Sequence, residues 1–334
     1  MISNMAVNEF MKNKIVILVF IIFIDLLYSF GAMAEEKPSV ERLVVVYPQS
    51  FGLVYIMGLS DKVVGIPSQQ LRITNGQLGP FYSKYSPNLA NAKSIGYPIV
   101  NIESVLKLSP DLVISSASLP SVQDLNKFLL EHNIKILPIE GRMGSAEDWI
   151  KLVRYACDQV GASERADAYI AFWNKELEYV KSRIDKIPLE NRVKVTLINA
   201  NGGEITVRGS RSRFTIDLIK LAGGIVMEGE DSPTESGANA ELVFKFDPDI
   251  IIDDYSKSAA APDWIKYLRA VKNNKVYSIP ADDEQAWFTN WTFNTYSPLG
   301  LLWFAKTFYP DYFKDLNIEK EHDLFTEMLL LHRE

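Results

Sequence analysis

Hydrophobic residues in the first part of the chain occur in two alternating patterns. From residue 41 onward, short β-branched runs are separated by segments in which apolar residues recur at helical spacing. The runs are RLVVVYP, KVVGIPS, DLVISS and IKILPIE, with helices predicted between them over 50–61, 101–109 and 121–133. Uninterrupted β-branched runs with intervening helices are typical of a parallel sheet covered on both faces. Residues 41–141 are therefore predicted to form an α/β lobe.

The next segment, residues 142–188, has no strand pattern. Two helices are predicted, over 146–161 and 163–187, with Gly161 ending the first and Ser163 as N-cap of the second. Pro188 follows the second helix. A helix of about 25 residues is nearly 40 Å long, which is enough to bridge two domains.

The alternation of strands and helices restarts in residues 189–334. Strands are predicted in RVKVTLINA, GEITVRG, DIIIDDY and KVYSIPA, and the chain ends in aromatic-rich helices. The predicted fold class is α/β, with two Rossmann-like lobes whose sheets are mostly parallel. The long helix bridges the lobes, and a ligand cleft lies between them.

The amino terminus has the pattern of an export signal. Lys12 and Lys14 precede ten apolar residues, 15–24, and the small-residue site Ala32-Met33-Ala34 follows. The apolar run is shorter than the roughly 20 residues that a membrane span needs. Residues 1–34 are therefore predicted to be a signal peptide cleaved after Ala34, with a retained membrane anchor as the alternative.

A fifteen-residue sequence occurs twice. NIESVLKLSPDLVIS begins at Asn101 and NAELVFKFDPDIIID begins at Asn239, with seven identical positions. Both copies are predicted to form a short helix, a Pro-Asp turn and a buried strand, with the asparagine as N-cap. Most of the identities need only duplication and packing. Glu103 and Glu241 are different, because any acid in the first turn would favour the helix dipole and yet glutamate occurs in both copies.

Composition and motifs exclude several function classes. The net charge of −7 argues against nucleic acid as a partner. A single cysteine, Cys157, allows no intramolecular disulfide and is predicted to be buried. The chain has three histidines, all predicted at the surface, and none of the GxSxG, P-loop and GxGxxG motifs. An exported enzyme that uses the acids of residues 229–236 and 253–255 remains the alternative of another class.

The predicted ligand site follows from the ends of the predicted strands, because ligands of doubly wound sheets bind outside the carboxyl ends. Arginines beside tryptophans suit a ligand with carboxylate or catecholate groups and flat rings. Scarce histidine disfavours a bare metal ion and favours a metal already held by an organic chelator. The predicted ligand contacts are Tyr47, Gln49, Arg142, Arg208, Arg211, Tyr255, Trp287 and Trp291, with further positions at 68–69 and 115–118.

The mature chain resembles the periplasmic substrate-binding proteins of ABC importers, in the class that carries iron-siderophores, haem, cobalamin and related chelates. The resemblance rests on VGIPS, the two copies of the repeat, QVGASERADAYIAFWNKELEYV and SPLGLLWFAKTFYPDYF, in this order and spacing. It implies a monomeric periplasmic protein without catalysis or a resident cofactor, whose cargo is a chelated metal, iron above all. Haem, cobalamin or a nickel chelate as cargo, and a sensor role, stay open.

The same resemblance assigns a role to the repeated glutamates. In that family a surface glutamate on each lobe docks onto arginines of the permease dimer, and Glu103 and Glu241 match those positions. The pseudo-two-fold axis of the binding protein would then meet the two-fold axis of the transporter in the inner membrane.

Overall fold

The computed structural model describes residues 39–46, 50–67, 79–96, 99–116, 120–139, 144–201, 204–207, 212–227, 240–253, 263–283 and 286–331. The chain divides into two units, Met1–Ser39 and Val40–Glu334, and the fold below is that of the second. The predicted signal peptide, residues 1–34, lies outside the described residues.

The first sheet has five parallel strands in the order β3-β2-β1-β4-β5. Its strands are β1 (Leu43–Val45), β2 (Val63–Ile66), β3 (Lys93–Ser94), β4 (Leu112–Ser116) and β5 (Lys135–Ile139). Leu43 and Val45 belong to one hydrophobic core, whereas Val44 and Val46 belong to another. Both faces of the sheet are therefore buried, which is why the strands have no polar alternation.

The helices that cover this sheet are short. They are α2 (Phe51–Ile56), α4 (Pro80–Tyr85), α5 (Ile102–Lys107) and α6 (Gln123–Glu131), with the 3-10 turns Ser60–Lys62, Pro87–Asn91 and Pro120–Val122. Side chains of α2 and α4 pack into the larger core, and side chains of α5 and α6 pack into the smaller one.

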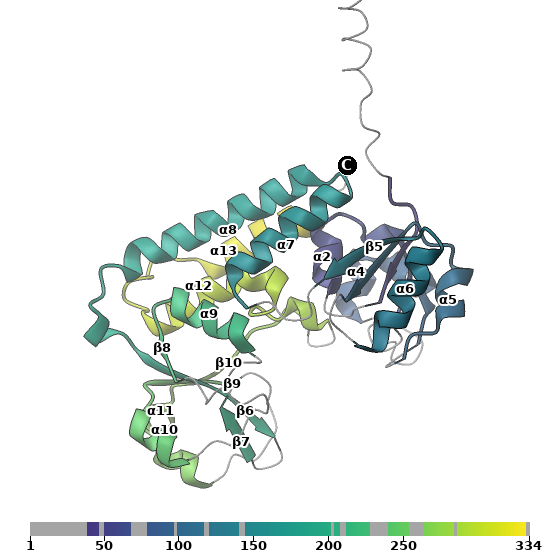
Figure 1. The fold of residues 1–334 in the computed structure, drawn as a ribbon. Helices are drawn as coiled ribbons and strands as arrows, with labels where there is room; N and C mark the ends of the chain where they lie inside the picture. Colours follow the sequence, from purple (N-terminus) through teal and green to yellow (C-terminus); the bar gives the residue numbers. More distant parts are fainter. Residues whose placement is uncertain are drawn as a thin grey trace, which may run out of the picture. The chain divides into compact units, whose positions relative to one another are not determined.

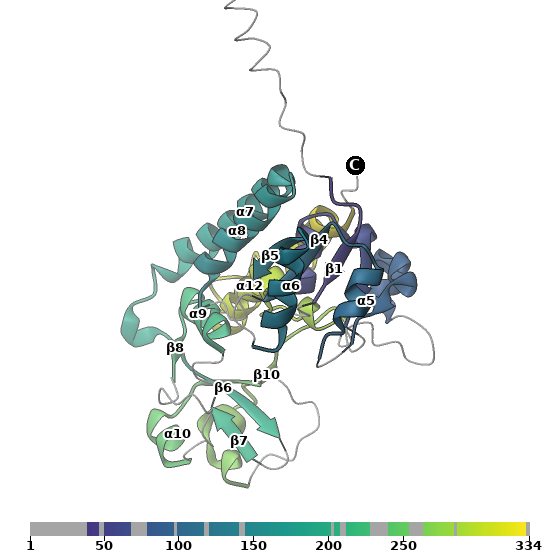
Figure 2. The same ribbon diagram turned by 45° about the vertical axis from the view of Figure 1, so that its right-hand side comes forward.

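Two longer helices follow, α7 (Ala146–Gln159) and α8 (Ser163–Ile184). They lie side by side in Figures 1 and 2, joined by a turn in which Gly161 has a positive φ of 73°. The predicted N-cap was wrong: Ala162 takes that place, and Ser163 donates from Oγ to Asp158 Oδ1 at 2.7 Å. The 22 residues of α8 span about 33 Å.

The second sheet, with order β10-β9-β6-β7, contains β6 (Lys194–Asn201), β7 (Glu204–Val207), β9 (Ile250–Asp253) and β10 (Val276–Ser278), and the short β8 (Ile225–Val226) also pairs with β6. Among the described strands only β7 runs antiparallel. The accompanying helices are α9 (Arg213–Leu221), α10 (Ala240–Phe246) and α11 (Arg269–Lys272), with 3-10 turns at Leu189–Asn191 and Asp263–Tyr267. The predicted fold class, with two mostly parallel sheets and covering helices, is confirmed.

After β10 the chain returns to the helices of the first sheet. This part contains the 3-10 turns Trp287–Thr289 and Asn294–Tyr296, then α12 (Ser297–Phe308), α13 (Ile318–Thr326) and a π-helical turn, Glu327–Leu331. The ring of Phe288 lies 5.3 Å from that of Tyr55 and 5.2 Å from that of Phe81, measured between centroids. The C-terminal segment thus forms a second connection between the sheets, and the predicted lobe boundaries remain predictions.

A buried tyrosine joins both connections. Trp149 of α7 donates from Nε1 to the Tyr169 hydroxyl of α8 at 2.9 Å, and that hydroxyl donates to the carbonyl of Thr295 at 2.9 Å. Burial raises the pKa of Tyr169, so the group stays a neutral donor.

Tyr169→Phe is expected to lower the free energy of unfolding by about 1–3 kcal/mol, because the indole N–H and the Thr295 carbonyl lose their buried partner. Tyr179→Phe on the same helix is the control, since its hydroxyl meets Asp315 at the surface; we expect a change within about 0.5 kcal/mol. Urea unfolding of both variants measures the difference. Equal losses of unfolding free energy in the two variants would show that the buried hydroxyl stabilises the fold no more than the surface hydroxyl does.

The repeated aspartates have the same structural role in both copies. Asp111 Oδ2 accepts from the backbone N–H groups of Glu41 and Arg42 at 2.8 and 3.0 Å, beside β1. Asp249 Oδ2 accepts from the backbone N–H of Lys194 at 2.8 Å, at the start of β6. Each aspartate therefore fixes the start of the central strand of its own sheet.

The turns before these aspartates also match. Ser109 and Asp247, equivalent positions of the repeat, both have a positive φ, 44° and 50°. Asn101 accepts from the N–H of Ser104 at 2.8 Å and caps α5 as predicted, whereas Asn239 lies outside the described residues. Packing and backbone geometry explain these positions of the repeat.

Candidate functional site

The strand order locates the expected binding edge of the first sheet. The chain adds β2 and β3 on one side of β1 and β4 and β5 on the other, so the order reverses between β1 and β4. Ligands of doubly wound sheets bind at the carboxyl ends of the strands at this switch point. Tyr47 and Gln49 come directly after β1, which ends at Val45. Both lie outside the described residues.

In the second sheet, the last residues of β7, β9 and β10 lie level with one another and with Ile198 in the middle of β6. Val207 pairs with Ile198, Ile198 with Asp253, and Asp253 with Ser278. Tyr255 comes two residues after the end of β9 in the sequence. The carboxyl-end rule does not apply to the strand before Arg208 and Arg211, because β7 runs in the opposite direction. The register of β7 places its last residue, Val207, level with the last residues of β9 and β10.

Most predicted ligand contacts fall outside the described residues: Tyr47, Gln49, Arg142, Arg208, Arg211, Tyr255 and the side chain of Trp287. Positions 68, 69, 117 and 118 do so as well. Ser115 and Ser116 are described as buried, and Ser115 donates from Oγ to Asn126 Oδ1 at 2.6 Å. Ser115 thus bonds to α6, and the ligand set stays a prediction.

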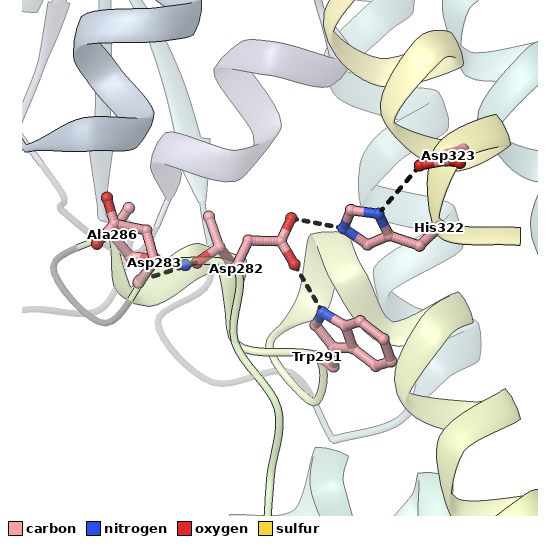
Figure 3. A network of polar contacts seen from close by, with 7 residues as sticks. Asp282, Asp283, Ala286, Trp291, His322 and Asp323 are labelled. Carbon is pink, nitrogen blue, oxygen red and sulfur yellow. Dashed lines mark hydrogen bonds and ion pairs between the residues drawn. The ribbon is translucent and has the colours of Figure 1, made fainter. Parts of the chain in front are cut away.

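Trp291 is the predicted contact whose side chain is described. Its indole Nε1 donates to Asp282 Oδ1 at 2.9 Å, and its ring stacks on the imidazole of His322 with centroids 5.7 Å apart and planes 24° apart. His322 Nε2 meets the other oxygen, Oδ2, of Asp282 at 2.8 Å. Figure 3 shows the two oxygens of the Asp282 carboxylate, one directed at the imidazole nitrogen and the other at the indole nitrogen. The indole N–H is thus used within the protein.

The environment of His322 differs from the sequence-based prediction. The side chain is 27% exposed and therefore half-buried, whereas His132 is exposed as predicted and His332 lies outside the described residues. The hydrogen bond to Asp282 raises the pKa of His322, and partial burial opposes this less strongly. No periodic pattern joins Asp282 to a histidine forty residues later, so the sequence offered no signal.

Asp283, the next residue, connects the same segment to the first sheet's helices. Its Oδ2 accepts from the backbone N–H of Phe81, in the first turn of α4, at 3.0 Å. Thr289 Oγ1 accepts from the N–H of Asp283 at 3.0 Å and donates to the carbonyl of Ala286 at 2.7 Å. The residues on both sides of Trp287 are therefore fixed by α4 and α13.

The predicted docking glutamates are both at the surface. Glu103 lies in the first turn of α5, and its nearest cation is Lys107, 3.9 Å away and one helical turn later. Glu241 lies in the first turn of α10 and is exposed. In both helices the valine two residues after the glutamate, Val105 or Val243, is buried. The glutamates thus project from equivalent faces of the two copies.

The described residues contain neither a metal-binding cluster nor a membrane-spanning helix. No group of three or more His, Cys, Asp or Glu side chains in this part of the chain could hold a metal ion. Within the same residues, no helix combines the length and hydrophobicity that crossing a membrane requires. Cys157 is buried and unpaired as predicted, and burial raises the pKa of its thiol to about 12.

Comparison with protein families decides the class. A family model described as periplasmic binding protein matches residues 43–282. The chain is a member of the periplasmic binding protein family. The family of the resemblance is confirmed, and members of it are transport binding proteins rather than enzymes.

Relatives of this binding protein differ in the ligands that their names give. The molybdate-binding protein MolA of Haemophilus influenzae is 24% identical over 331 residues, covering 87% of this chain and 90% of its own. The haem uptake protein IsdE of Staphylococcus aureus is 27% identical over 218 residues, 60% of this chain and 70% of its own. A solute-binding protein structure from Veillonella parvula matches with a TM-score of 0.69 and 24% identity, over 89% and 90% of the chains.

Among the described residues of this binding protein, α10 carries exposed apolar side chains beside its glutamate, whereas α5 carries none. Leu242 and Phe244 of α10 are exposed, and the Phe244 ring lies 5.8 Å from that of Trp264. Tyr267, three residues after Trp264 in a 3-10 turn, is also exposed. At the equivalent positions, the first copy of the repeat has Ser104 in place of Leu242 and the half-buried Leu106 in place of Phe244. Aromatic residues are enriched at protein interfaces, so the second copy has the more interface-like surface.

Proposed function

We propose that this protein captures a metal chelate, an iron-siderophore above all, outside the inner membrane and delivers it to an ABC permease. The observation that carries the proposal is the family match over residues 43–282. Two doubly wound sheets with predicted contacts at their strand ends support a binding function. The protein itself supplies no reaction: its work is selective capture and release.

The cargo class follows from the predicted contacts. Arg142, Arg208 and Arg211 offer bidentate donors for carboxylate or catecholate oxygens in a chain whose net charge is −7. Tyr47 and Tyr255 add aromatic surface. A chelate brings its own metal ligands, so the protein needs only these complementary groups. Haem, cobalamin and a nickel chelate satisfy the same description and are the alternative cargoes.

An oxyanion is the second candidate. MolA, whose name states molybdate binding, aligns over 87% of this chain, more than IsdE does. Arginine forks suit a tetrahedral oxyanion as well as a carboxylate. Such a ligand has no flat ring, so it would leave the aromatic contacts without a role.

The partner and location complete the proposal. The chain is exported by the signal in residues 1–34, cleaved after Ala34, and acts in the periplasm as a monomer. It docks through Glu103 and Glu241 onto arginines of the permease dimer in the inner membrane. The pseudo-symmetric faces of α5 and α10 support this arrangement, and the apolar side chains beside Glu241 add contact area.

A ligand panel tests the cargo. We expect one probe among a ferric hydroxamate, a ferric catecholate, haem, cobalamin, a nickel–histidine complex and molybdate to bind at micromolar or lower Kd. Calorimetry measures affinity, and intrinsic tryptophan fluorescence reports proximity. Binding of molybdate alone would replace the chelate by the oxyanion, and the absence of binding by every probe would contradict the proposed cargo classes.

Trp287→Phe locates the site. The fluorescence change with the bound probe should fall by about half or more, because a tryptophan in contact with the ligand contributes most of the quenching. Trp303→Phe is the matched control, since Trp303 lies in α12 beside Phe304. An unchanged signal in Trp287→Phe would remove that residue from the site.

A further inference from the structure

The Asp282–Trp291–His322 cluster fixes a segment whose neighbours are predicted to touch ligand. Asp282 and Trp291 belong to the segment after β10, which also contains the 3-10 turn that starts at Trp287. His322 belongs to α13, forty residues later. Both oxygens of the Asp282 carboxylate are engaged by these two rings, Oδ1 by Trp291 and Oδ2 by His322. The cluster is therefore the polar link between that segment and α13.

Protonation changes the strength of this link. The Asp282 side chain is 18% exposed and that of His322 is 27% exposed, so water screens the pair only partly. A protonated imidazole faces the carboxylate as an ion pair and stacks as a cation on the Trp291 indole. A neutral imidazole keeps a hydrogen bond to Asp282 but loses the ion pair with this carboxylate and the cation–π interaction with the Trp291 indole.

We propose that His322 is a positioning residue whose protonated form holds the segment around Trp287 against α13, so that the order of this segment and the affinity for ligand decrease with rising pH. The effect on affinity rests on the proposed binding function, in which Trp287 contacts the cargo. The effect on the segment itself does not depend on any ligand.

The direction of the pH dependence follows from the charged groups around the imidazole. Asp282 faces Nε2, and Asp323 of α13 lies 3.9 Å from Nδ1 but is 88% exposed. Tyr296 is buried near Asp282, and burial raises the pKa of its hydroxyl, so it remains neutral. The pKa of His322 is raised above 6.5. The stabilisation is thus complete below about pH 6.5 and is lost as pH rises through the folded-state pKa.

Hydrogen exchange of the free protein tests the positioning effect. Between pH 6.0 and 8.5, after correction for the intrinsic exchange rate, the protection of peptides covering 281–291 should fall about threefold or more. In His322→Gln this fall should disappear. His132→Gln is the matched control, because His132 is an exposed histidine on α6, and it should behave like the native protein. NMR titration of the three histidines should show the His322 pKa falling in Asp282→Asn.

The outcomes separate the inference from the proposed function. Protection that does not vary with pH in the native protein, or varies equally in His322→Gln, overturns the inference. The ligand arm compares the affinity of a ferric catecholate and of haem at both pH values in the native protein and in His322→Gln. A pH effect on protection with no binding of any probe would retain the positioning effect and reject the proposed cargo. Binding whose pH dependence is the same in both proteins would reject the link to affinity.

Discussion

Glu103→Lys/Glu241→Lys is expected to lower transport at least about a hundredfold while ligand affinity stays within about twofold of the native value. Both carboxylates are exposed on the surface of short helices that precede β4 and β9, and predicted ligand contacts follow the far ends of these strands, so the cargo should not sense the change. Like charges placed opposite each other at an interface cost several kcal/mol, and about 3 kcal/mol corresponds to a hundredfold loss of affinity. Uptake of the labelled probe by cells that carry the native transporter measures the effect.

The control variant carries the same change in net charge. Glu178→Lys/Glu190→Lys replaces two exposed glutamates, one on α8 and one in the 3-10 turn that follows it. It should transport at nearly the native rate, so that a loss in the first variant reflects position rather than total charge. If affinity for the ligand falls in Glu103→Lys/Glu241→Lys instead, the glutamates belong to the binding site. If transport is retained, the docking assignment is wrong.

The two docking helices should not contribute equally. Glu103 is flanked by Ser104, whereas Glu241 is flanked by the exposed Leu242 and lies on the same helix as Phe244. Apolar contact adds affinity that salt does not screen, while the attraction of exposed charges weakens at high ionic strength. In the proposed docking, the apolar side chains of the second copy add binding energy to the charge shared by both copies.

The fold was predictable because its signals are local. Buried parallel strands give continuous β-branched runs, and the long helix α8 follows from apolar periodicity ended by Pro188. Details predicted from the repeat are also confirmed: Asn101 caps α5, and Val105 and Val243 are buried. Each of these features depends on residues close together in sequence.

The features that could not be predicted depend on contacts between residues of different helices and strands. The antiparallel direction of β7 is set by its pairing with β6, and a short apolar run is the same in either direction. The predicted cap at Ser163 failed because its hydroxyl bonds to Asp158, a side chain of the preceding helix. The Asp282–His322 contact joins two segments whose separation no pattern encodes. Ligand contacts remain predictions for the same reason, since they lie in loops without periodicity.

Arg165→Met is expected to have the largest effect on stability, a loss of about 3 kcal/mol in the free energy of unfolding. Arg165 lies in the first turn of α8 and donates to three backbone carbonyls from two other elements. Its Nε reaches the carbonyl of Ile56 at 2.8 Å, and its Nη2 reaches those of Tyr55 and Leu329 at 3.0 and 3.1 Å. Methionine keeps the aliphatic contacts but removes the donor to the Ile56 and Leu329 carbonyls, whereas the Tyr55 carbonyl still accepts from the N–H of Gly58 at 3.0 Å. Each buried unsatisfied group costs about 1–3 kcal/mol.

The physical consequence of that loss extends beyond one helix end. Arg165 attaches the start of α8 to α2 and to the π-helical turn, while the end of α8 packs through Ile184 near Gly223, after α9. The helix α8 therefore holds elements of the two sheets in a fixed arrangement only if its start is attached by Arg165. Arg154→Met on α7 is the matched control, because Arg154 pairs with the exposed Asp167 at the surface, and it should cost less than about 1 kcal/mol. Urea unfolding that gives equal losses for the two variants would show that the carbonyl contacts of Arg165 contribute no more than a surface ion pair.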